Sequence, residues 1–162
     1  MIGNRSFVLS VLVLLALGLV TSAAIADQTC RKVNSNITAL GEFLVDDPQC
    51  GDYDFCQSAD IRGTLNGTWW VFGNDSDVEI IAGGTVQAFY LDAVVETKQG
   101  DLYTVDREIV NLLAADGLAF HDAVAETGGT GRYEGATGWF AGYLTFAPVG
   151  GKLAGEICWN GD

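Results

Sequence analysis

The sequence predicts an all-β protein built on an antiparallel sheet, either a closed barrel or a sandwich. Apolar and polar residues alternate with the period of two that is typical of strands, and almost nowhere with the period of a helix. Turn-forming residues separate these segments at intervals of about 10–15 residues. Such short spacing leaves no room for the helical crossovers that parallel strands need, so neighbouring strands are expected to run antiparallel.

Length and composition indicate one packed domain. The chain has 162 residues, of which 49% are hydrophobic and 10% aromatic. This length matches a single domain, and the apolar content is enough to form a core. We divide the chain into a signal peptide at residues 1–26, an N-terminal extension with a disulfide loop at 27–55 that belongs to the domain, and the sheet core at 56–162.

The charge balance restricts the class of partner. The chain holds 8 basic and 21 acidic residues, which gives a formal net charge of −13. A basic patch for nucleic acid or an anionic membrane surface is therefore not expected. We expect a partner that is neutral, apolar or cationic.

The N-terminal 26 residues have the pattern of an export signal. Arg5 precedes an apolar run at residues 7–20, and Ala24-Ile25-Ala26 matches the small-x-small cleavage pattern. The alternative is a membrane anchor, but the apolar run is about 14 residues long and a bilayer core needs ~20. We therefore predict a secreted or periplasmic protein without stable membrane insertion after cleavage.

All four cysteines follow the predicted signal, where an oxidising compartment favours two disulfides. The preferred pairing is Cys30 with Cys158, which ties the ends of the domain together, and Cys50 with Cys56, which fixes a local loop. The rival pairing joins Cys56 to Cys158 and Cys30 to Cys50. A zinc site is disfavoured because the five residues between Cys50 and Cys56 exceed the usual knuckle spacing. We expect no metal and no cofactor.

Strands are predicted in order along the second half of the chain. The segment at 85–97 places Phe89, Leu91, Ala93 and Val95 on one face, and the segment at 101–113 follows a turn and pairs with it. The remaining predicted strands are at 61–72, 118–127, 139–146 and 152–159. The alternative of a helix at 111–120 has only a loose fit to the helical period.

One glycine-rich segment resembles a known family. Residues 128–138, GGTGRYEGATG, closely resemble the G-G-T-G-[RK]-[FY]-x-G-A-x-G segment of barrels similar to allene oxide cyclases and dirigent proteins. Residues 56–72 and 153–158 are similar to secreted bacterial members, so the resemblance covers about residues 56–159. It implies a single antiparallel eight-stranded β-barrel, stapled here by disulfides, that binds or cyclises a small apolar molecule without metal or cofactor. Homo-oligomers are common among such barrels.

The glycines of this segment are expected to serve the fold. Glycine allows positive φ and close backbone approach where the chain turns sharply between strands. A nucleotide-binding loop is a poor alternative, because Glu134 occupies the position where the third glycine would be needed. The structural glycines are Gly128, Gly129, Gly131, Gly135 and Gly138.

Few residues suggest chemistry. Arg107 shares a predicted strand face with Tyr103, and a guanidinium inside a barrel would need a partner or an anionic ligand. In the opposite register Asp106 and Glu108 point inward, where a carboxyl could act as general acid or base. His121 is the single histidine, and a structural or surface role is the simplest interpretation. The candidate interior polar residues are therefore Tyr103, Arg107, Glu108 and His121.

Two functional hypotheses follow. The first is a secreted module that holds a small apolar molecule or serves as an oligomerising scaffold, because no recognised catalytic constellation is present. The second is a cofactor-free cyclase, isomerase or dirigent-type director that acts on a small hydrophobic intermediate. An open cavity with converging polar groups would favour the second.

Overall fold

The computed structural model describes residues 28–111, 113, 118–125 and 128–160, without the side chains of 118–125 and 160. The predicted signal peptide lies outside these residues. About three quarters of the described chain is strand, with four three-residue 3-10 turns. The elements are β1 (Gln28–Val45), η1 (Pro48–Cys50), β2 (Phe55–Gly63), β3 (Gly67–Gly73), η2 (Asp75–Asp77), β4 (Val78–Ile81), η3 (Ala82–Gly84), β5 (Val86–Thr97), β6 (Gly100–Asn111), β7 (Leu118–Ala125), η4 (Gly131–Tyr133), β8 (Thr137–Phe146) and β9 (Val149–Asn160).

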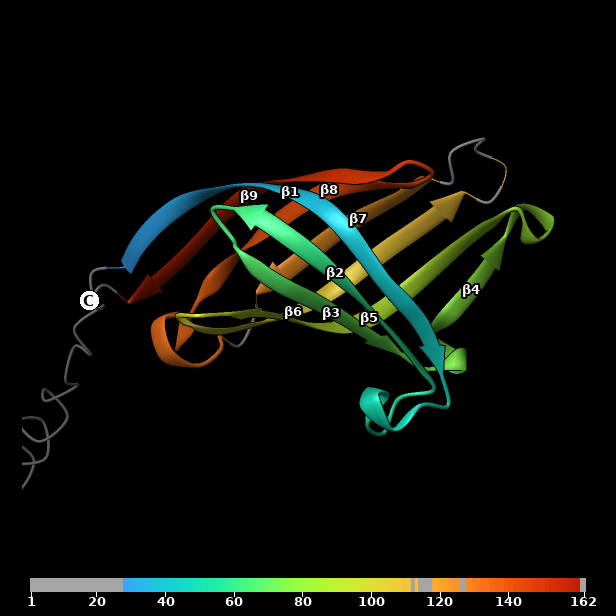
Figure 1. The fold of residues 1–162 in the computed structure, drawn as a ribbon, viewed down its shortest axis with the longest axis horizontal. Coiled ribbons are helices and arrows are strands. Elements are labelled where there is room, and N and C mark those ends of the chain that lie inside the picture. Colours follow the sequence, from blue (N-terminus) through green and yellow to red (C-terminus); the bar gives the residue numbers. More distant parts are fainter. Residues whose placement is uncertain (1–27, 112, 114–117, 126–127, 161–162) are drawn as a thin grey trace, which may run out of the picture.

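The strands form one curled antiparallel sheet, which confirms the predicted all-β class (Figure 1). Its nine strands lie in the order β3-β2-β1-β9-β8-β7-β6-β5-β4. β3 is also hydrogen-bonded to β5, with Gly67 opposite Thr97 and Phe72 opposite Asp92. Because sequence neighbours are mostly neighbours in the sheet, short turns at the two ends of the strands connect most of the elements.

The concave face of the sheet holds the core. Alternate residues of the strands point inward, as the period-two pattern predicts. The buried apolar side chains form one cluster that includes Ile61, Trp69, Val95, Phe140 and Leu153. One buried polar side chain, Ser35, lies among them on β1, where its hydroxyl donates to the Leu65 carbonyl at 3.0 Å and accepts from the Leu65 amide at 2.9 Å.

Two parts of the fold differ from the sequence-based expectation. The N-terminal extension expected at 27–55 contains β1, which at 18 residues is the longest strand described. The single strand expected at 61–72 is divided into β2 and β3, because Gly63 has a φ of 142° and the chain turns around Leu65. The contact between Ser35 and the Leu65 backbone holds this turn against β1.

The helix considered at 111–120 is contradicted at both ends of that stretch. Asn111 is the last residue of β6, and residues 118–120 begin β7. Among the residues that the structure describes, none of the helical segments is long and apolar enough to cross a membrane.

Both predicted disulfides are confirmed. The Cys30–Cys158 bridge joins the first residues of β1 to the last residues of β9, and these two cysteines are also register partners. The Cys50–Cys56 bridge links η1 to the start of β2. Each bridge therefore lies near a different end of the curled sheet.

Candidate functional site

One end of the curled sheet opens into an apolar pocket. It lies where β1 and β8 end and where β2 and β5 begin, and four phenylalanines line it: Phe43, Phe55, Phe89 and Phe146. We call this the phenylalanine end. The rings of Phe43 and Phe55 stack at 5.5 Å, and Phe55 meets Phe89 edge to face at 6.1 Å. The pocket has a volume of about 270 Å³, close to the lower limit of small-molecule sites in proteins.

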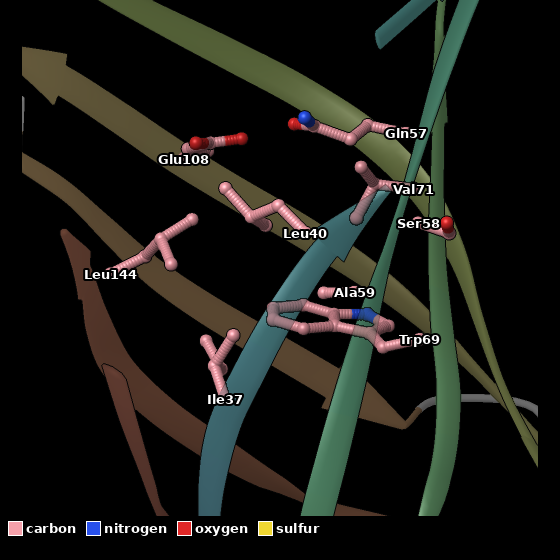
Figure 2. Close-up of a pocket in the computed structure, with 9 residues that line it drawn as sticks. All are labelled: Ile37, Leu40, Gln57, Ser58, Ala59, Trp69, Val71, Glu108 and Leu144. Atoms are coloured by element: carbon pink, nitrogen blue, oxygen red, sulfur yellow. The ribbon is translucent and has the colours of Figure 1, made fainter. Parts of the chain in front are cut away.

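A smaller cavity continues from this pocket toward the core. Its volume is about 20 Å³, enough for one or two water molecules. Gln57, Val71 and Glu108 line both spaces, so the two are adjacent. Figure 2 shows the head groups of Gln57 and Glu108 facing one another from opposite walls, with Leu40 between them and Trp69 farther in. The site therefore combines an aromatic entrance with two polar groups at its base.

The polar groups of the interior are concentrated on β6. Thr104 and Asp106 are buried, and Glu108 is half-buried as the strand approaches the phenylalanine end. Leu91 is the register partner of Asp106, and Phe89 is the register partner of Glu108. A carboxylate thus lies beside aromatic rings at the base of the pocket.

The four residues predicted to point into the interior do not all lie there in the structure. Tyr103 is 43% exposed, and Arg107 lies on the same outer face, where its guanidinium sits 5.6 Å from the ring centre of Tyr90. Glu108 lines the pocket, as the opposite register of this strand predicts. His121 is the backbone partner of Glu108 in the β6–β7 ladder, and its side chain lies outside the described part of the structure.

The loops around the pocket are tied together. The Cys50–Cys56 bridge fixes the β1–β2 loop, and the Asp54 carboxylate accepts from the Asp75 amide at 2.9 Å. The Tyr53 hydroxyl donates to Asp92 on β5 at 2.6 Å. This hydrogen bond, together with burial and the negative charges of Asp92, Asp52 and Asp77, raises the pKa of Tyr53 from 10.0 to about 12. The entrance is thereby held in one geometry.

At the opposite end of the sheet, which we call the glycine-loop end, a loop covers the core. The loop at 128–138 lies across the start of β6. The Thr130 amide donates to the Asp101 carbonyl at 2.8 Å, and the Tyr103 backbone amide donates to the Gly128 carbonyl at 2.9 Å. Gly128 has a φ of 89°, and a Cβ there would lie 2.6 Å from the Gly135 nitrogen. Glycine is therefore required at this position.

The loop places an aromatic plug in the interior. Tyr133 is 4% exposed and meets Trp159 edge to face at 6.0 Å. The Arg132 guanidinium lies 4.6 Å from the ring centre of the same tryptophan and donates to the Gln99 side chain at 2.7 Å. Beside the plug lies a polar hollow of about 330 Å³ lined by Thr64, Lys98 and Arg132 among others.

Charge is distributed unequally between the two ends. Residues 42–57 and 73–92, which form part of the phenylalanine end, carry nine carboxylates and no Lys or Arg: Glu42, Asp46, Asp47, Asp52, Asp54, Asp75, Asp77, Glu79 and Asp92. Arg107 on β6 lies on the outer face beside Tyr90. Of the Lys and Arg side chains that the structure describes, all are exposed except Arg132, which is half-buried at the glycine-loop end. The aromatic entrance thus lies in a negative environment.

The described residues bring one further group of ligand-type atoms together, at Cys30, Glu156 and Cys158. The two sulfurs are joined in a disulfide, so this group has no thiolate to offer to a metal.

Sequence reasoning found Glu108 but missed the aromatic entrance and Gln57. The four phenylalanines are far apart in the chain, and each belongs to a different strand. A signal was present in the alternation of Phe55, Gln57 and Ala59, which share one face of β2. Comparison of the chain with protein-family models, curated proteins and solved structures gives no match.

Proposed function

We propose that this protein is an exported module that binds a small apolar molecule in the pocket at the phenylalanine end. The observation that supports the proposal is a space of about 270 Å³ with four phenylalanines around it and a carboxylate and an amide at its base. Apolar walls with a few convergent polar groups are the usual composition of small-molecule sites. The tied loops support it further, because a pre-formed entrance reduces the entropy that binding costs.

The proposal includes a closed eight-stranded barrel with β4 outside the ring. The pairing of β3 with both β2 and β5 supports closure, since it leaves neither β3 nor β5 as a free edge. A resemblance to allene oxide cyclase-like and dirigent-like barrels remains part of the proposal and rests on residues 128–138. Two disulfides support export, because such bonds persist in oxidising compartments.

The experiment is a titration with N-phenyl-1-naphthylamine, a neutral fluorophore that becomes bright in apolar surroundings. The protein would be prepared without denaturation, with both disulfides intact. We expect saturable enhancement, and we expect Phe43→Ala to weaken it about tenfold, because a large aromatic contact surface is lost from the wall.

Tyr143→Ala is the matched control for this titration. Phe43 and Tyr143 are similarly exposed, at 52% and 46%, but Tyr143 lies on β8 and lines none of the pockets described. Equal weakening by both variants, or no saturable enhancement in the unmodified protein, would contradict the proposed pocket.

Catalysis is the second candidate function, and Glu108 is the observation that favours it. A carboxyl beside a bound apolar molecule could accept or donate a proton in a cofactor-free cyclisation or isomerisation. Mass spectrometry of small molecules that copurify with the protein, compared with those from Glu108→Gln, would test it. The same molecule in both samples would support binding alone, and a different isomer in the variant would support catalysis.

A self-associating scaffold is less well supported. Large apolar side chains are exposed on the outer face, including Tyr90, Ile109, Trp139 and Tyr143. Sedimentation velocity would detect stable association, and a monomer at all concentrations would exclude a scaffold of this kind.

A further inference from the structure

A polar hollow lies at the glycine-loop end, between three turns of the chain. Thr64 and Asn66 come from the turn between β2 and β3, Lys98 and Gln99 from the turn between β5 and β6, and Arg132 from η4. The hollow has a volume of about 330 Å³, within the range of small-molecule sites. Of the described residues that line it, two are cationic and none is acidic.

The guanidinium of Arg132 carries a charge that the described protein groups do not neutralise. Arg132 is half-buried, and its Nε–H is buried without an acceptor among the residues that the structure describes. It contacts two neutral groups, the Trp159 ring at 4.6 Å and the Gln99 side-chain oxygen at 2.7 Å. Within the described part of the chain, neither Arg132 nor Lys98 forms an ion pair with a carboxylate. Because a charge removed from water is normally paired, an anion at this place would complete the site.

The position of Arg132 is fixed by Gln99. The Arg132 backbone amide donates to the Gln99 carbonyl at 2.9 Å, and the Arg132 side chain donates to the Gln99 side chain. Gln99 is held in turn, because its backbone amide donates to the Thr97 hydroxyl at 3.0 Å. A guanidinium held in this way loses little conformational entropy when it binds a ligand.

We infer that the hollow binds a small hydroxylated oxyanion, a carboxylate or phosphate with a body the size of a sugar. Arg132 and Lys98 donate to the anionic oxygens, and a guanidinium matches the geometry of both kinds of group. Thr64 and Asn66 offer a hydroxyl and an amide to the hydroxyl groups of the ligand. No described residue lines both this hollow and the pocket at the phenylalanine end, so the inference is independent of the proposed function.

The negative net charge of the chain does not decide the sign of charge inside the hollow. The nine carboxylates named above belong to segments that form part of the opposite end, and salt screens exposed charges beyond about 8 Å at physiological ionic strength. Asp101 and Glu134 follow the lining residues closely in the chain, but neither lines the hollow, and the Asp101 carboxylate accepts from the Thr130 hydroxyl at 3.3 Å. The lining charges that a ligand meets are those of Arg132 and Lys98.

Isothermal titration calorimetry on the intact protein tests the inference with four sugars that differ in charge: glucuronate, glucose 6-phosphate, glucose and glucosamine. We expect at least one of the two anions to bind about tenfold tighter than glucose, because hydrogen bonds to charged donors are roughly twice as strong when the acceptor is ionised. The tighter of the two identifies the oxyanion as a carboxylate or a phosphate. Glucosamine, a cation, should bind no better than glucose.

Arg132→Gln and Lys98→Gln each remove one charge from the hollow, and Lys152→Gln is the matched control. Lys98 and Lys152 are both exposed, but Lys152 lies on β9 and lines none of the pockets described. We expect Arg132→Gln to weaken anion binding about tenfold and Lys98→Gln about threefold, with Lys152→Gln unchanged. Lys98→Gln keeps the test decisive if Arg132→Gln disturbs the loop, since Lys98 is an exposed turn residue.

The outcomes separate this inference from the proposed function. Equal affinity for glucose and both anions, or equal affinity of Lys98→Gln and Lys152→Gln for the anion, would overturn the oxyanion site. Either result leaves the fluorophore titration of the apolar pocket unaffected, because Phe43 lies at the other end of the sheet. An anion-binding protein that fails to bind the fluorophore would support this inference and contradict the proposed function.

Discussion

At the glycine-loop end a tyrosine that is 4% exposed fills the interior, whereas at the phenylalanine end Phe43 is 52% exposed and borders an open pocket. Both ends use aromatic side chains, but the chain supplies them differently. Tyr133 comes from a loop that crosses the sheet and is hydrogen-bonded to β6 through Thr130. The phenylalanines come from four strands that stop around a common space.

This difference assigns different roles to the two ends. A loop that inserts its own side chain removes apolar surface from water and so contributes to stability. A ring of strand ends without such a loop leaves apolar surface exposed to a ligand, at a cost in stability. The comparison shows that one sheet buries its apolar surface at one end and leaves an open apolar pocket at the other, according to whether a loop covers it.

Removal of one disulfide at a time should give the largest difference in unfolding free energy between the two ends. The Cys30–Cys158 bridge spans 128 residues, and the Cys50–Cys56 bridge spans 6. Loop-closure entropy predicts that the double variant C30A/C158A loses about 5 kcal/mol of unfolding free energy and that C50A/C56A loses about 2 kcal/mol. Denaturant unfolding of both variants and of the intact protein would measure the two losses.

The loss of fluorophore binding should rank the same two double variants in the opposite order. The Cys50–Cys56 bridge holds the loop at the phenylalanine end, so C50A/C56A should weaken fluorophore binding more than C30A/C158A does under conditions where both are folded. A larger stability loss for C50A/C56A, or weaker binding for C30A/C158A, would contradict the proposed division between the ends.

Truncation of one aromatic residue at each end sharpens the comparison further. Tyr133→Ala removes a buried ring that packs on Trp159, and we expect it to cost about 3–4 kcal/mol of unfolding free energy, in the range of large core truncations. Phe43→Ala removes a half-exposed ring and should cost less than about 1 kcal/mol. Chemical denaturation of the two variants checks the difference, and equal losses would show that Phe43 belongs to the core.

The sequence could predict those parts of the fold that depend on local pattern. Alternation and turn residues predict strands close to β5, β6, β8 and β9, and chain-closure arguments predict both disulfides. β1 was missed because the inward position between Val33 and Ile37 is occupied by a serine, which interrupts the apolar pattern. The buried Ser35 hydroxyl is satisfied by hydrogen bonds to the backbone of Leu65. Because Leu65 is thirty positions away, a local sequence pattern could not indicate that this serine faces the core.

The orientation of β6 could not be predicted for a similar reason. Its outer face carries Tyr103, Val105 and Ile109, which are all exposed, while its inner face carries Thr104, Asp106 and Glu108. In the middle of the strand the apolar side chains therefore face outward, opposite to the usual rule for a half-buried strand, whereas Leu102 and Val110 near its two ends point into the core. Only the pairing of β6 with β5 and β7 determines which face lines the pocket.

A smaller effect than the loss of a disulfide or of the Tyr133 ring is expected for the hydrogen bond between Tyr53 and Asp92 beside the entrance. Tyr53→Phe should cost about 1 kcal/mol of unfolding free energy below pH 10, because one hydrogen bond to a carboxylate is lost from a partly exposed site. The folded-state pKa of Tyr53 is raised from 10.0 to about 12, so the unfolded chain loses this proton at a lower pH than the folded chain does. The stabilisation is therefore complete below pH 10 and is lost as the pH rises toward 12.

Unfolding experiments on the intact protein and on Tyr53→Phe across this pH interval would measure the difference, with Tyr143→Phe, exposed on β8, as the control. The difference between the intact protein and Tyr53→Phe should shrink with rising pH, whereas the Tyr143→Phe difference should stay near zero throughout. A constant difference for Tyr53→Phe would mean that the hydroxyl is not tied to Asp92 in solution. The loop at 46–54 would then be held at the entrance by the Cys50–Cys56 bridge and by the hydrogen bond between Asp54 and the Asp75 amide.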